Sequence, residues 1–250
     1  MFRAALRLLL VCAAAAAAVL LALVLLRWRG LILLPHEANP GQWEVFGVDV
    51  SSYQGVVDWP ALAGQGVDFA FLKATEGSAM RDARFAANWE GARAAGIRVG
   101  AYHFLSYDSP GESQAENFIA AVPAAEDALP PVVDLEFYGP YLESPPEREH
   151  VRAILDPLLA RLEEHYGVKP ILYVTYRSYY RYLLGGGYGD YPIWCSSPTV
   201  FPLVPGWDFW QYSHTGVLEG YSGSQSCIDL NIFRGSAARF QQFGLGQAPF

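Results

Sequence analysis

The strongest constraint on the fold is a regular alternation, between residues 45 and 235, of short apolar runs and longer segments with helical periodicity. The apolar runs have the length of strands and are bounded by Gly, Pro or polar residues. We predict eight strands, over residues 45–50, 68–73, 97–104, 132–136, 170–174, 191–195, 207–212 and 227–232. Because strands that alternate with helices form a parallel sheet, we expect one α/β domain built as a (β/α) barrel of the TIM-barrel type.

The helical segments lie mainly between the earlier strands. Helices are predicted over residues 82–95, 113–122, 146–166 and 178–184. Asp58 is the expected N-cap of a further short helix, and Gly96 is the expected C-terminal stop of the first long one. Little helix is expected between the last three strands, so the final units of the barrel should lack helices.

The N-terminal residues differ in composition from the rest of the chain. Residues 8–26 form an apolar run of 19 residues, close to the ~20 needed to cross a bilayer, and Arg27 and Arg29 follow it directly. A cleaved signal peptide has a shorter apolar core and a polar cleavage site, so we favour an uncleaved signal anchor over cleavage within the alanine run. The basic residues favour a cytoplasmic N-terminus, which places the main domain outside the cytoplasm, periplasmic or extracellular.

This interpretation divides the chain into five parts. They are a cytoplasmic basic stub over residues 1–7, a transmembrane anchor over 8–26, a linker over 27–44, the barrel over 45–235 and a C-terminal tail over 236–250. The linker contains two prolines and is expected to hold the barrel off the membrane. The tail has no strong pattern and is expected to be loose. If the anchor is cleaved, the barrel is secreted.

Composition narrows the class of partner. The formal net charge of -8 argues against a nucleic acid partner. Aromatic residues make up 14% of the chain and suit the faces of sugar rings, although aromatic side chains are more often part of a core. Neither H-E-x-x-H nor a paired C-x-x-C motif occurs, so we predict no metal site and no cofactor. Cys195 and Cys227 are the two cysteines of the exported part, and we predict a disulfide between them, with two buried free thiols as the alternative.

A pair of acids ends the strand predicted over residues 132–136. Asp134 and Glu136 are separated by one leucine, and because side chains alternate along a strand, both point to the same face. Crowded carboxyls in an apolar setting raise the pKa of one of them, and a raised acid beside an ionised carboxylate is what glycoside cleavage needs. For an isolated D-x-E the favoured interpretation is structural, as a loop cap or a salt bridge.

Polar side chains at the other strand ends favour a catalytic over a structural interpretation of this pair. They are Asp49, Lys73 with Glu76, Tyr102 with His103, Tyr173, Trp194, Gln211 and Asp229. In (β/α) barrels function gathers at the carboxyl ends of the strands, whereas structural acids would be scattered over strand starts and helix faces. The distribution favours an active site. Lys73 and Glu76 can instead form a structural ion pair, and His103 can be a hydrogen-bonded core histidine.

Six short motifs follow one another in a specific order. They are GVDVSSYQG at residues 47–55 with Asp58 and Trp59 after it, FLKATEG at 71–77, GAYHF at 100–104, PVVDLE at 131–136, WQY at 210–212 and DLN at 229–231. Each motif alone is weak, but on the ordered set the chain resembles the glycoside hydrolase family 25 lysozymes, which are N-acetylmuramidases. The resemblance covers roughly residues 45–235 and leaves out the anchor, the linker and the tail.

The resemblance implies a flattened, irregular barrel and hydrolysis of the β-1,4 bond between N-acetylmuramic acid and N-acetylglucosamine in peptidoglycan. It implies Glu136 as proton donor, Asp134 as its partner, Asp49 and Asp229 as the other acids of the site, and Tyr102 as a substrate contact. Together with Tyr102, the side chains assigned to substrate binding are Lys73, Glu76, Tyr173, Trp194 and Gln211. We expect a monomer that contacts the membrane through its anchor.

Several alternatives stay open on the sequence. Asp134 can act as a nucleophile, as a base that activates water, or as the group that orients the N-acetyl group of the substrate. Asp49 and Asp229 can stabilise a cationic transition state or simply hydrogen-bond their neighbours. The chain can also be a glycan-binding relative without catalysis, or a hydrolase of another amino-sugar polymer such as chitin.

Overall fold

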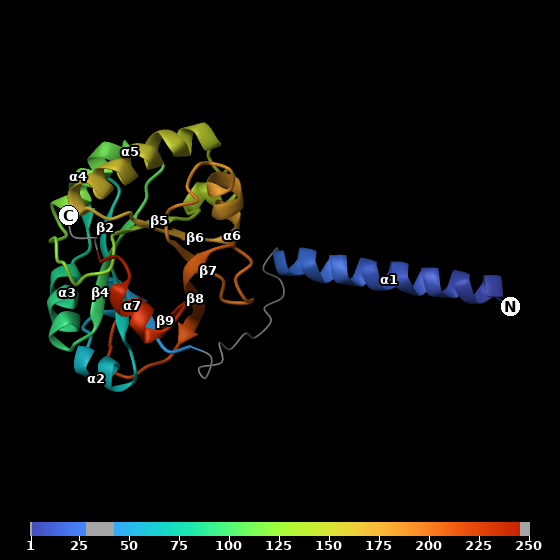
Figure 1. The fold of residues 1–250 in the computed structure, drawn as a ribbon, viewed down its shortest axis with the longest axis horizontal. Helices are drawn as coiled ribbons and strands as arrows, with labels where there is room; N and C mark the ends of the chain where they lie inside the picture. Colours follow the sequence, from blue (N-terminus) through green and yellow to red (C-terminus); the bar gives the residue numbers. More distant parts are fainter. Residues whose placement is uncertain (1, 29–42, 246–250) are drawn as a thin grey trace. The chain divides into compact units, whose positions relative to one another are not determined.

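The computed structural model describes residues 2–28 and 43–245, and a single sheet forms the centre of the larger part (Figure 1). Within the described residues the sheet has nine strands. They are β1 Phe46–Val50, β2 Phe69–Glu76, β3 Met80–Arg81, β4 Arg98–Phe104, β5 Val132–Leu135, β6 Ile171–Val174, β7 Ile193–Ser196, β8 Trp207–Gly216 and β9 Ile228–Phe233. All eight strands predicted from the sequence are present, and the two-residue β3 is an addition.

The strands other than β3 close into a barrel, in the order β1-β2-β4-β5-β6-β7-β8-β9 and back to β1. Pairing is parallel from β1 through to β8. Strand β9 runs antiparallel to both of its neighbours, β8 and β1, so the prediction of an all-parallel sheet is wrong at this strand. Residues 217–227 contain no helix that could carry the chain back across the barrel, so β8 turns directly into an antiparallel partner.

Helices cover the outside of the barrel along its first six strands, while β7 to β9 have none between them (Figure 1). The helices are α2 Trp59–Gly64, α3 Phe85–Ala94, α4 Gly111–Ile119, α5 Arg148–Tyr166 and α6 Tyr176–Ser178, with single turns η2 Ser52–Gln54 and η3 Gly139–Leu142. The helix predicted over residues 178–184 is split, since α6 continues as the π-helical turn η4 Tyr179–Leu183. Asp58 caps α2 as predicted, because its carboxylate accepts a hydrogen bond of 3.1 Å from the Ala61 amide.

Side-chain alternation along the strands produces two apolar layers. One layer lies between the strands and the helices, and the other fills the inside of the barrel with aromatic rings. Phe71 stacks on Trp194 with ring centroids 4.4 Å apart, and Phe69 meets the edge of Phe209 at 5.3 Å. The rings fill the interior of the barrel, so a pocket can form only at the carboxyl ends of the parallel strands.

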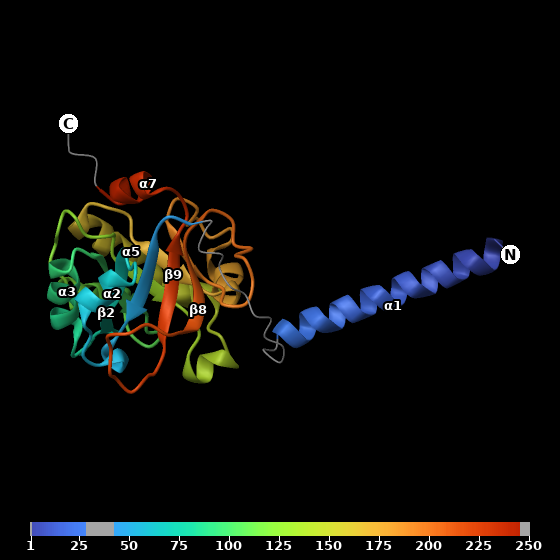
Figure 2. The same cartoon turned by 90° about the horizontal axis from the view of Figure 1, so that it is seen from below.

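The amino-terminal end of the barrel is covered by a helix that the sequence did not predict. Helix α7 Ala237–Gln242 lies across this end (Figure 2). Its Phe240 is buried against Phe69 and Phe233. The guanidinium of Arg98 donates hydrogen bonds to the carbonyls of Phe240 and Phe243. The loose tail expected over residues 236–250 is therefore wrong for its first part, because one buried aromatic ring and one arginine order it.

The N-terminal residues form a unit of their own, with helix α1 Phe2–Trp28. Among the residues that the structure describes, no helix combines the length and the apolarity needed to span a bilayer. Most of the linker predicted over residues 27–44 lies outside the described residues.

The predicted disulfide is wrong in this structure, where Cys195 and Cys227 are both free thiols. Cys195 lies on β7 beside Trp210 of β8, and Trp210 lies beside Ile232 of β9. Cys227 precedes the start of β9, five positions before Ile232, which is ~16 Å along a strand. A disulfide needs Cα atoms within about 7 Å, so the register of the sheet keeps the two thiols apart.

Candidate active site

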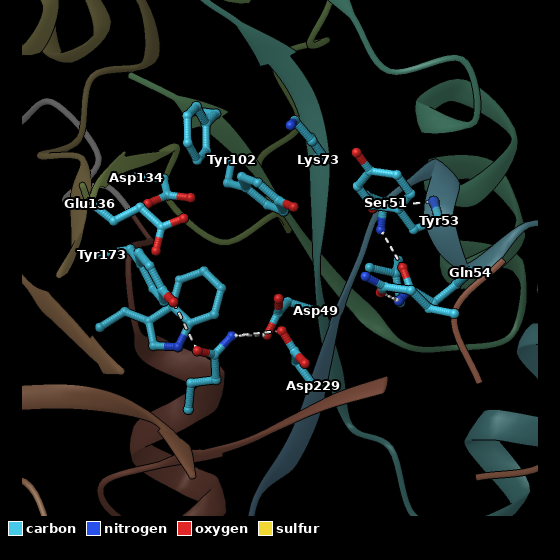
Figure 3. A pocket seen from close by; sticks show the side chains of 15 residues that line it. Asp49, Ser51, Tyr53, Gln54, Lys73, Tyr102, Asp134, Glu136, Tyr173 and Asp229 are labelled. Carbon is cyan, nitrogen blue, oxygen red and sulfur yellow. Dashed lines mark hydrogen bonds between the residues drawn. The ribbon is translucent and has the colours of Figure 1, made fainter. Parts of the chain in front are cut away.

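A pocket of about 270 Å³ opens at the carboxyl ends of the parallel strands. Its lining comes from most of the barrel strands and from the loops that follow β1 and β8. The lining residues are Asp49, Val50, Ser51, Tyr53, Gln54, Lys73, Tyr102, Phe104, Asp134, Glu136, Tyr173, Trp194, Gln211, Gln225 and Asp229 (Figure 3). The fold thus gathers nine of the ten predicted catalytic and substrate-binding residues, and only Glu76 is left out of the lining.

The two acids at the end of β5 lie side by side in this pocket, as the strand alternation predicted (Figure 3). Asp134 is 8% exposed, and its Oδ1 is buried without a hydrogen-bond partner among the described residues. Burial raises the pKa of Asp134 well above its usual value, and the neighbouring Glu136 raises it further. Burial also raises the pKa of Glu136, against the opposing charges of His214 and Lys73. The pair therefore holds protons more strongly than free carboxyls do.

A second pair of acids, Asp49 and Asp229, lies opposite them in the pocket (Figure 3). The two residues are direct partners in the antiparallel register of β1 and β9. Sequence reasoning expected Asp229 at the end of a parallel strand. It lies instead near the start of the antiparallel strand β9, and the reversed direction brings it to the same end of the barrel.

Two amide side chains hold Asp49 in place. Gln211 Nε2 and Asn231 Nδ2 each donate a hydrogen bond of 2.8 Å to Asp49 Oδ2. Gln211 Nε2 also lies 3.2 Å from Asp229 Oδ2, so it bridges the two acids. Burial and the charge of Asp229 raise the pKa of Asp49 to about 8, although these hydrogen bonds act in the opposite direction. Asp49 therefore keeps its proton at neutral pH.

Tyr173 and Trp194 set the orientation of the two amides. The Tyr173 hydroxyl donates a hydrogen bond of 2.8 Å to Gln211 Oε1, and Trp194 Nε1 donates one of 2.8 Å to Asn231 Oδ1. With each amide oxygen occupied in this way, each amide nitrogen must face the acids. Tyr173, Trp194 and Gln211, assigned to substrate binding, thus also form the hydrogen-bonded support of Asp49.

Lys73 and Tyr102 complete the polar lining on the side of β2 and β4. Lys73 Nζ lies 2.8 Å from a carboxylate oxygen of Glu76 and 4.9 Å from the centre of the Phe104 ring. Glu76 thus orients Lys73 from outside the pocket, which fits the structural ion pair that the sequence left open. Burial raises the pKa of the Tyr102 phenol well above its usual value, and Asp49 and Asp134 raise it further, so Tyr102 stays a neutral hydroxyl.

Two stacked tyrosines support the backbone around Glu136. The Tyr107 hydroxyl donates a hydrogen bond of 2.9 Å to the carbonyl oxygen of Glu136, and the Tyr138 hydroxyl accepts one of 3.0 Å from the Tyr107 amide. Their rings are parallel within 5° with centroids 5.5 Å apart. These contacts hold the backbone that carries Glu136 at the end of β5.

His103 is a structural histidine and does not line the pocket. Its Nδ1 lies 2.7 Å from the Thr75 hydroxyl, and its Nε2 lies 2.9 Å from Gln114 Oε1. Burial lowers its pKa to about 4, so the ring is neutral at physiological pH. This is the hydrogen-bonded core histidine that the sequence left as an alternative.

Sequence reasoning missed part of the pocket lining, namely Val50, Ser51, Tyr53, Gln54, Phe104 and Gln225, and two residues that contact its acids, Asn231 and His214. Asn231 is the second residue after Asp229 within the DLN motif, so a search for polar partners of the strand-end acids would have found it. His214 lies on β8 with Nδ1 3.7 Å from Asp229 Oδ2, and this contact raises the His214 pKa. Gln225 lies in the loop between β8 and β9. Gln225 carries no local sequence signal, because the turn from β8 into β9 brings it to the pocket, and the contact of His214 exists because the antiparallel β9 carries Asp229.

The chemistry available to the pocket is that of carboxyl groups and neutral hydrogen-bonding groups. Within residues 2–28 and 43–245, no group of three or more His, Cys, Asp or Glu side chains is arranged to hold a metal ion. A carboxyl with a raised pKa can give a proton to a leaving oxygen, and a neighbouring carboxylate can stabilise positive charge that develops at the adjacent carbon. These two acts together break an acetal bond, as in glycosides.

Comparisons with known proteins agree with this chemistry. The sequence profile of "Glycosyl hydrolases family 25" matches residues 48–221. A solved family 25 glycosyl hydrolase from Bacillus anthracis is 46% identical, with a TM-score of 0.78 over 84% of this chain and 97% of that one. A solved bacterial lysozyme from Streptomyces coelicolor is 33% identical, with a TM-score of 0.72 over 81% and 97%. Lysozyme M1 of Streptomyces globisporus is 36% identical over 214 residues, which are 78% of this chain and 69% of that protein.

Proposed function

The chain belongs to glycosyl hydrolases family 25, and on this basis we propose that it is a lysozyme of the muramidase type that hydrolyses peptidoglycan. The bond cleaved is the β-1,4 bond between N-acetylmuramic acid and N-acetylglucosamine. Two of the similar proteins are named lysozymes. The single observation that carries the proposal is the pair of the buried Asp134 and the half-buried Glu136, which shares one pocket with the acids Asp49 and Asp229.

Glu136 is the proton donor in this proposal. Its carboxyl gives a proton to the oxygen of the glycosidic bond, the bond from that oxygen to the anomeric carbon breaks, and the N-acetylglucosamine side leaves as an alcohol. A water molecule then supplies the hydroxyl of the new reducing end, and its remaining proton returns to a carboxylate of the site. The raised pKa of Glu136 supports this role, since the acid must be protonated when the substrate binds.

In its ionised form Asp134 stabilises the positive charge that develops at the anomeric carbon, so this role requires that Glu136 carry the proton although burial raises the pKa of both carboxyls. Its buried Oδ1, which lacks a partner among the described residues, can accept a hydrogen bond from the substrate or approach that carbon. Action as a nucleophile or through the N-acetyl group retains the anomeric configuration of the product, whereas action as a base on water inverts it. Proton NMR of the first product formed therefore separates the inverting role from the other two.

The test of the proposal compares the full-length chain with its Glu136→Gln variant. Glutamine keeps the size and polarity of the side chain but cannot donate the proton as an acid, so we expect turnover to fall ~10²–10⁴-fold. Glu90→Gln is the matched control, because Glu90 is exposed on α3, outside the barrel. The measurement is mass spectrometry of peptidoglycan fragments after reduction with borohydride, with chitin as a parallel substrate.

The outcomes separate the functions left open by the sequence. New reducing ends on muramic acid identify a muramidase, and efficient release of chitin fragments would identify the alternative hydrolase. A glycan-binding relative would bind peptidoglycan without releasing fragments. A folded Glu136→Gln protein with the rate of the unmodified chain would overturn the role given to Glu136.

We further propose that the enzyme acts outside the cytoplasm, where peptidoglycan is found. The apolar run at residues 8–26 supports a signal anchor, followed by a linker at 27–44 and the catalytic unit at 45–235. The anchor predicts that host membranes washed with carbonate at high pH retain a full-length species. A soluble mature form that begins within the alanine run would refute the anchor and support secretion.

A further inference from the structure

The loop between β8 and β9, residues 217–227, is docked along the segment that follows β1. Tyr221 forms an antiparallel bridge with Val57, and the Asp58 amide donates a hydrogen bond of 2.6 Å to the Gly220 carbonyl. Gln65 exchanges two hydrogen bonds of 2.9 Å with the backbone of Glu219. Residues 222–227 lie beyond residues 48–221, which the family profile matches.

Two glycines bring this loop into direct backbone contact with the turn after η2. A Cβ atom at Gly223 would lie 2.0 Å from the Tyr53 carbonyl oxygen, and one at Gly55 would lie 2.8 Å from the Gly223 Cα. Gly55 also has a φ of +67°, which favours glycine. The Gln225 amide donates a hydrogen bond of 3.2 Å to the Tyr53 carbonyl, which fixes the backbone of Gln225 at the pocket edge.

The side chain of Gln225 is oriented by Gln54. The Ser51 amide donates a hydrogen bond of 2.9 Å to Gln54 Oε1, which turns Gln54 Nε2 toward the loop (Figure 3 shows Ser51 with Gln54). Gln54 Nε2 then donates one of 2.8 Å to Gln225 Oε1. Because the oxygen of Gln225 is taken, its two N–H groups remain, and no hydrogen bond from them is found among the described residues. The exposed side chain of Gln225 thus presents an oriented donor at the pocket edge, with no protein partner among the described residues.

We propose that Gln225 is a specificity-determining residue that donates a hydrogen bond to the carbonyl oxygen of an N-acetyl group on the bound glycan. This inference rests on the proposed function, which supplies a substrate that carries acetamido groups. The donor needs an acceptor oxygen, which on such a glycan is offered by acetyl carbonyls, hydroxyls and carboxylates. Gln225 thereby distinguishes N-acetylated from de-N-acetylated sugars. It does so at the pocket edge formed by Tyr53 and Gln54, away from Asp134 and Glu136.

Charge favours the neutral acetyl carbonyl over a carboxylate. The pocket holds four acids, Asp49, Asp134, Glu136 and Asp229, and the Lys73 ammonium is already paired with Glu76. A substrate carboxylate would find no counter-charge at Gln225, which offers a neutral N–H group, and any of these acids that ionises would repel it, whereas an amide carbonyl carries no net charge. A hydroxyl of the glycan is a less specific partner for Gln225, because it can rotate and donate its hydrogen to one of the acids instead.

The test uses the full-length chain on two substrates, peptidoglycan that is fully N-acetylated and the same material after chemical de-N-acetylation. Gln225→Met removes the donor while keeping the length of the side chain. We expect kcat/KM to fall ~5–10-fold on the acetylated substrate, mainly through KM, and less than ~2-fold on the de-N-acetylated one. Gln241→Met on α7, at the opposite end of the barrel, is the matched control and should match the unmodified chain on both.

A second variant separates the donor from the anchoring of the loop. Gln225→Glu keeps an oxygen for Gln54 Nε2 but offers no N–H, so it should lose the preference for acetylated substrate as Gln225→Met does. Equal losses on both substrates, or no loss in either variant, would overturn the inference. Failure of the unmodified chain to release muramic acid ends from either substrate would overturn the proposed function instead.

Discussion

Replacement of Asp49 by asparagine should make the barrel more stable at alkaline pH. Asp49 is 9% exposed and faces Asp229, so its ionisation in the folded protein is opposed by both burial and charge. Asparagine has nearly the same shape. Its oxygen can accept the two hydrogen bonds that Gln211 and Asn231 donate to Asp49 Oδ2, and its amide can donate to Asp229.

The magnitude follows from the pKa of Asp49, which rises from 3.8 to about 8 on folding. Between these values the folded protein holds a proton that the unfolded chain has lost, so the free energy of unfolding falls as pH rises from about 4 to about 8. One pKa unit is worth ~1.4 kcal/mol, which gives an upper value of ~6 kcal/mol for the full rise. Because the hydrogen bonds that Gln211 and Asn231 donate to Asp49 act against this rise, we expect Asp49→Asn to gain ~2–4 kcal/mol at pH 8 and little at pH 4.

The assay is thermal unfolding of the full-length chain in mild detergent, followed by the near-ultraviolet circular dichroism of the barrel tryptophans between pH 4 and pH 9. For a protein of this size ~1 kcal/mol corresponds to about 2–4 °C, so the two melting curves should separate clearly above pH 7. Asp208→Asn is not a suitable control, since Asp208 pairs with Arg239, and Asp190 pairs with Lys169, but Glu90→Gln at an exposed position on α3 is suitable. Parallel pH profiles of the unmodified chain and Asp49→Asn would refute the reasoning.

Three further changes test the packing and the thiols. Phe240→Ala should destabilise the barrel by ~3–5 kcal/mol, because it removes a buried ring that closes the amino-terminal end; chemical unfolding measures this. Gly111→Ala should cost at least ~1–3 kcal/mol in the same assay, because its Cβ would lie 1.9 Å from the Ile154 carbonyl oxygen of α5. Cys195 and Cys227 should both react with a thiol reagent when the unreduced protein is denatured. In the native protein Cys195 should stay unreactive, because burial raises its pKa to about 12. If neither thiol reacts in the unreduced, denatured protein, the predicted disulfide between Cys195 and Cys227 is present after all.

Local patterns in the sequence were sufficient for the strands and for the acids of β5. Asp134 and Glu136 point the same way because side chains alternate along any strand, whatever surrounds it. The strand-end positions of Asp49, Tyr102 and Tyr173 follow from the same argument, since the carboxyl ends of parallel strands meet at one edge. These features need only short-range geometry, and the structure agrees with them.

The direction of β9 was decided by the tertiary structure. Its apolar run is compatible with either direction, and the choice depends on the helix-free connection after β8 and on the edge of β1 that closes the barrel. That choice brings Asp229 and Gln225 to the pocket, places Asp229 beside His214, and keeps Cys227 far from Cys195. None of these placements can be read from neighbouring residues.

The protonation of the site was likewise beyond the sequence. The types of the acids and their spacing identified candidates, but the rise of the Asp49 pKa depends on its burial and on Asp229, a partner 180 positions later. The amides that hold Asp49 are oriented by Tyr173 and Trp194 from two other strands. A sequence determines which groups can take part in such a network, whereas only the closed barrel determines their distances, and electrostatic and hydrogen-bond energies depend on distance and burial.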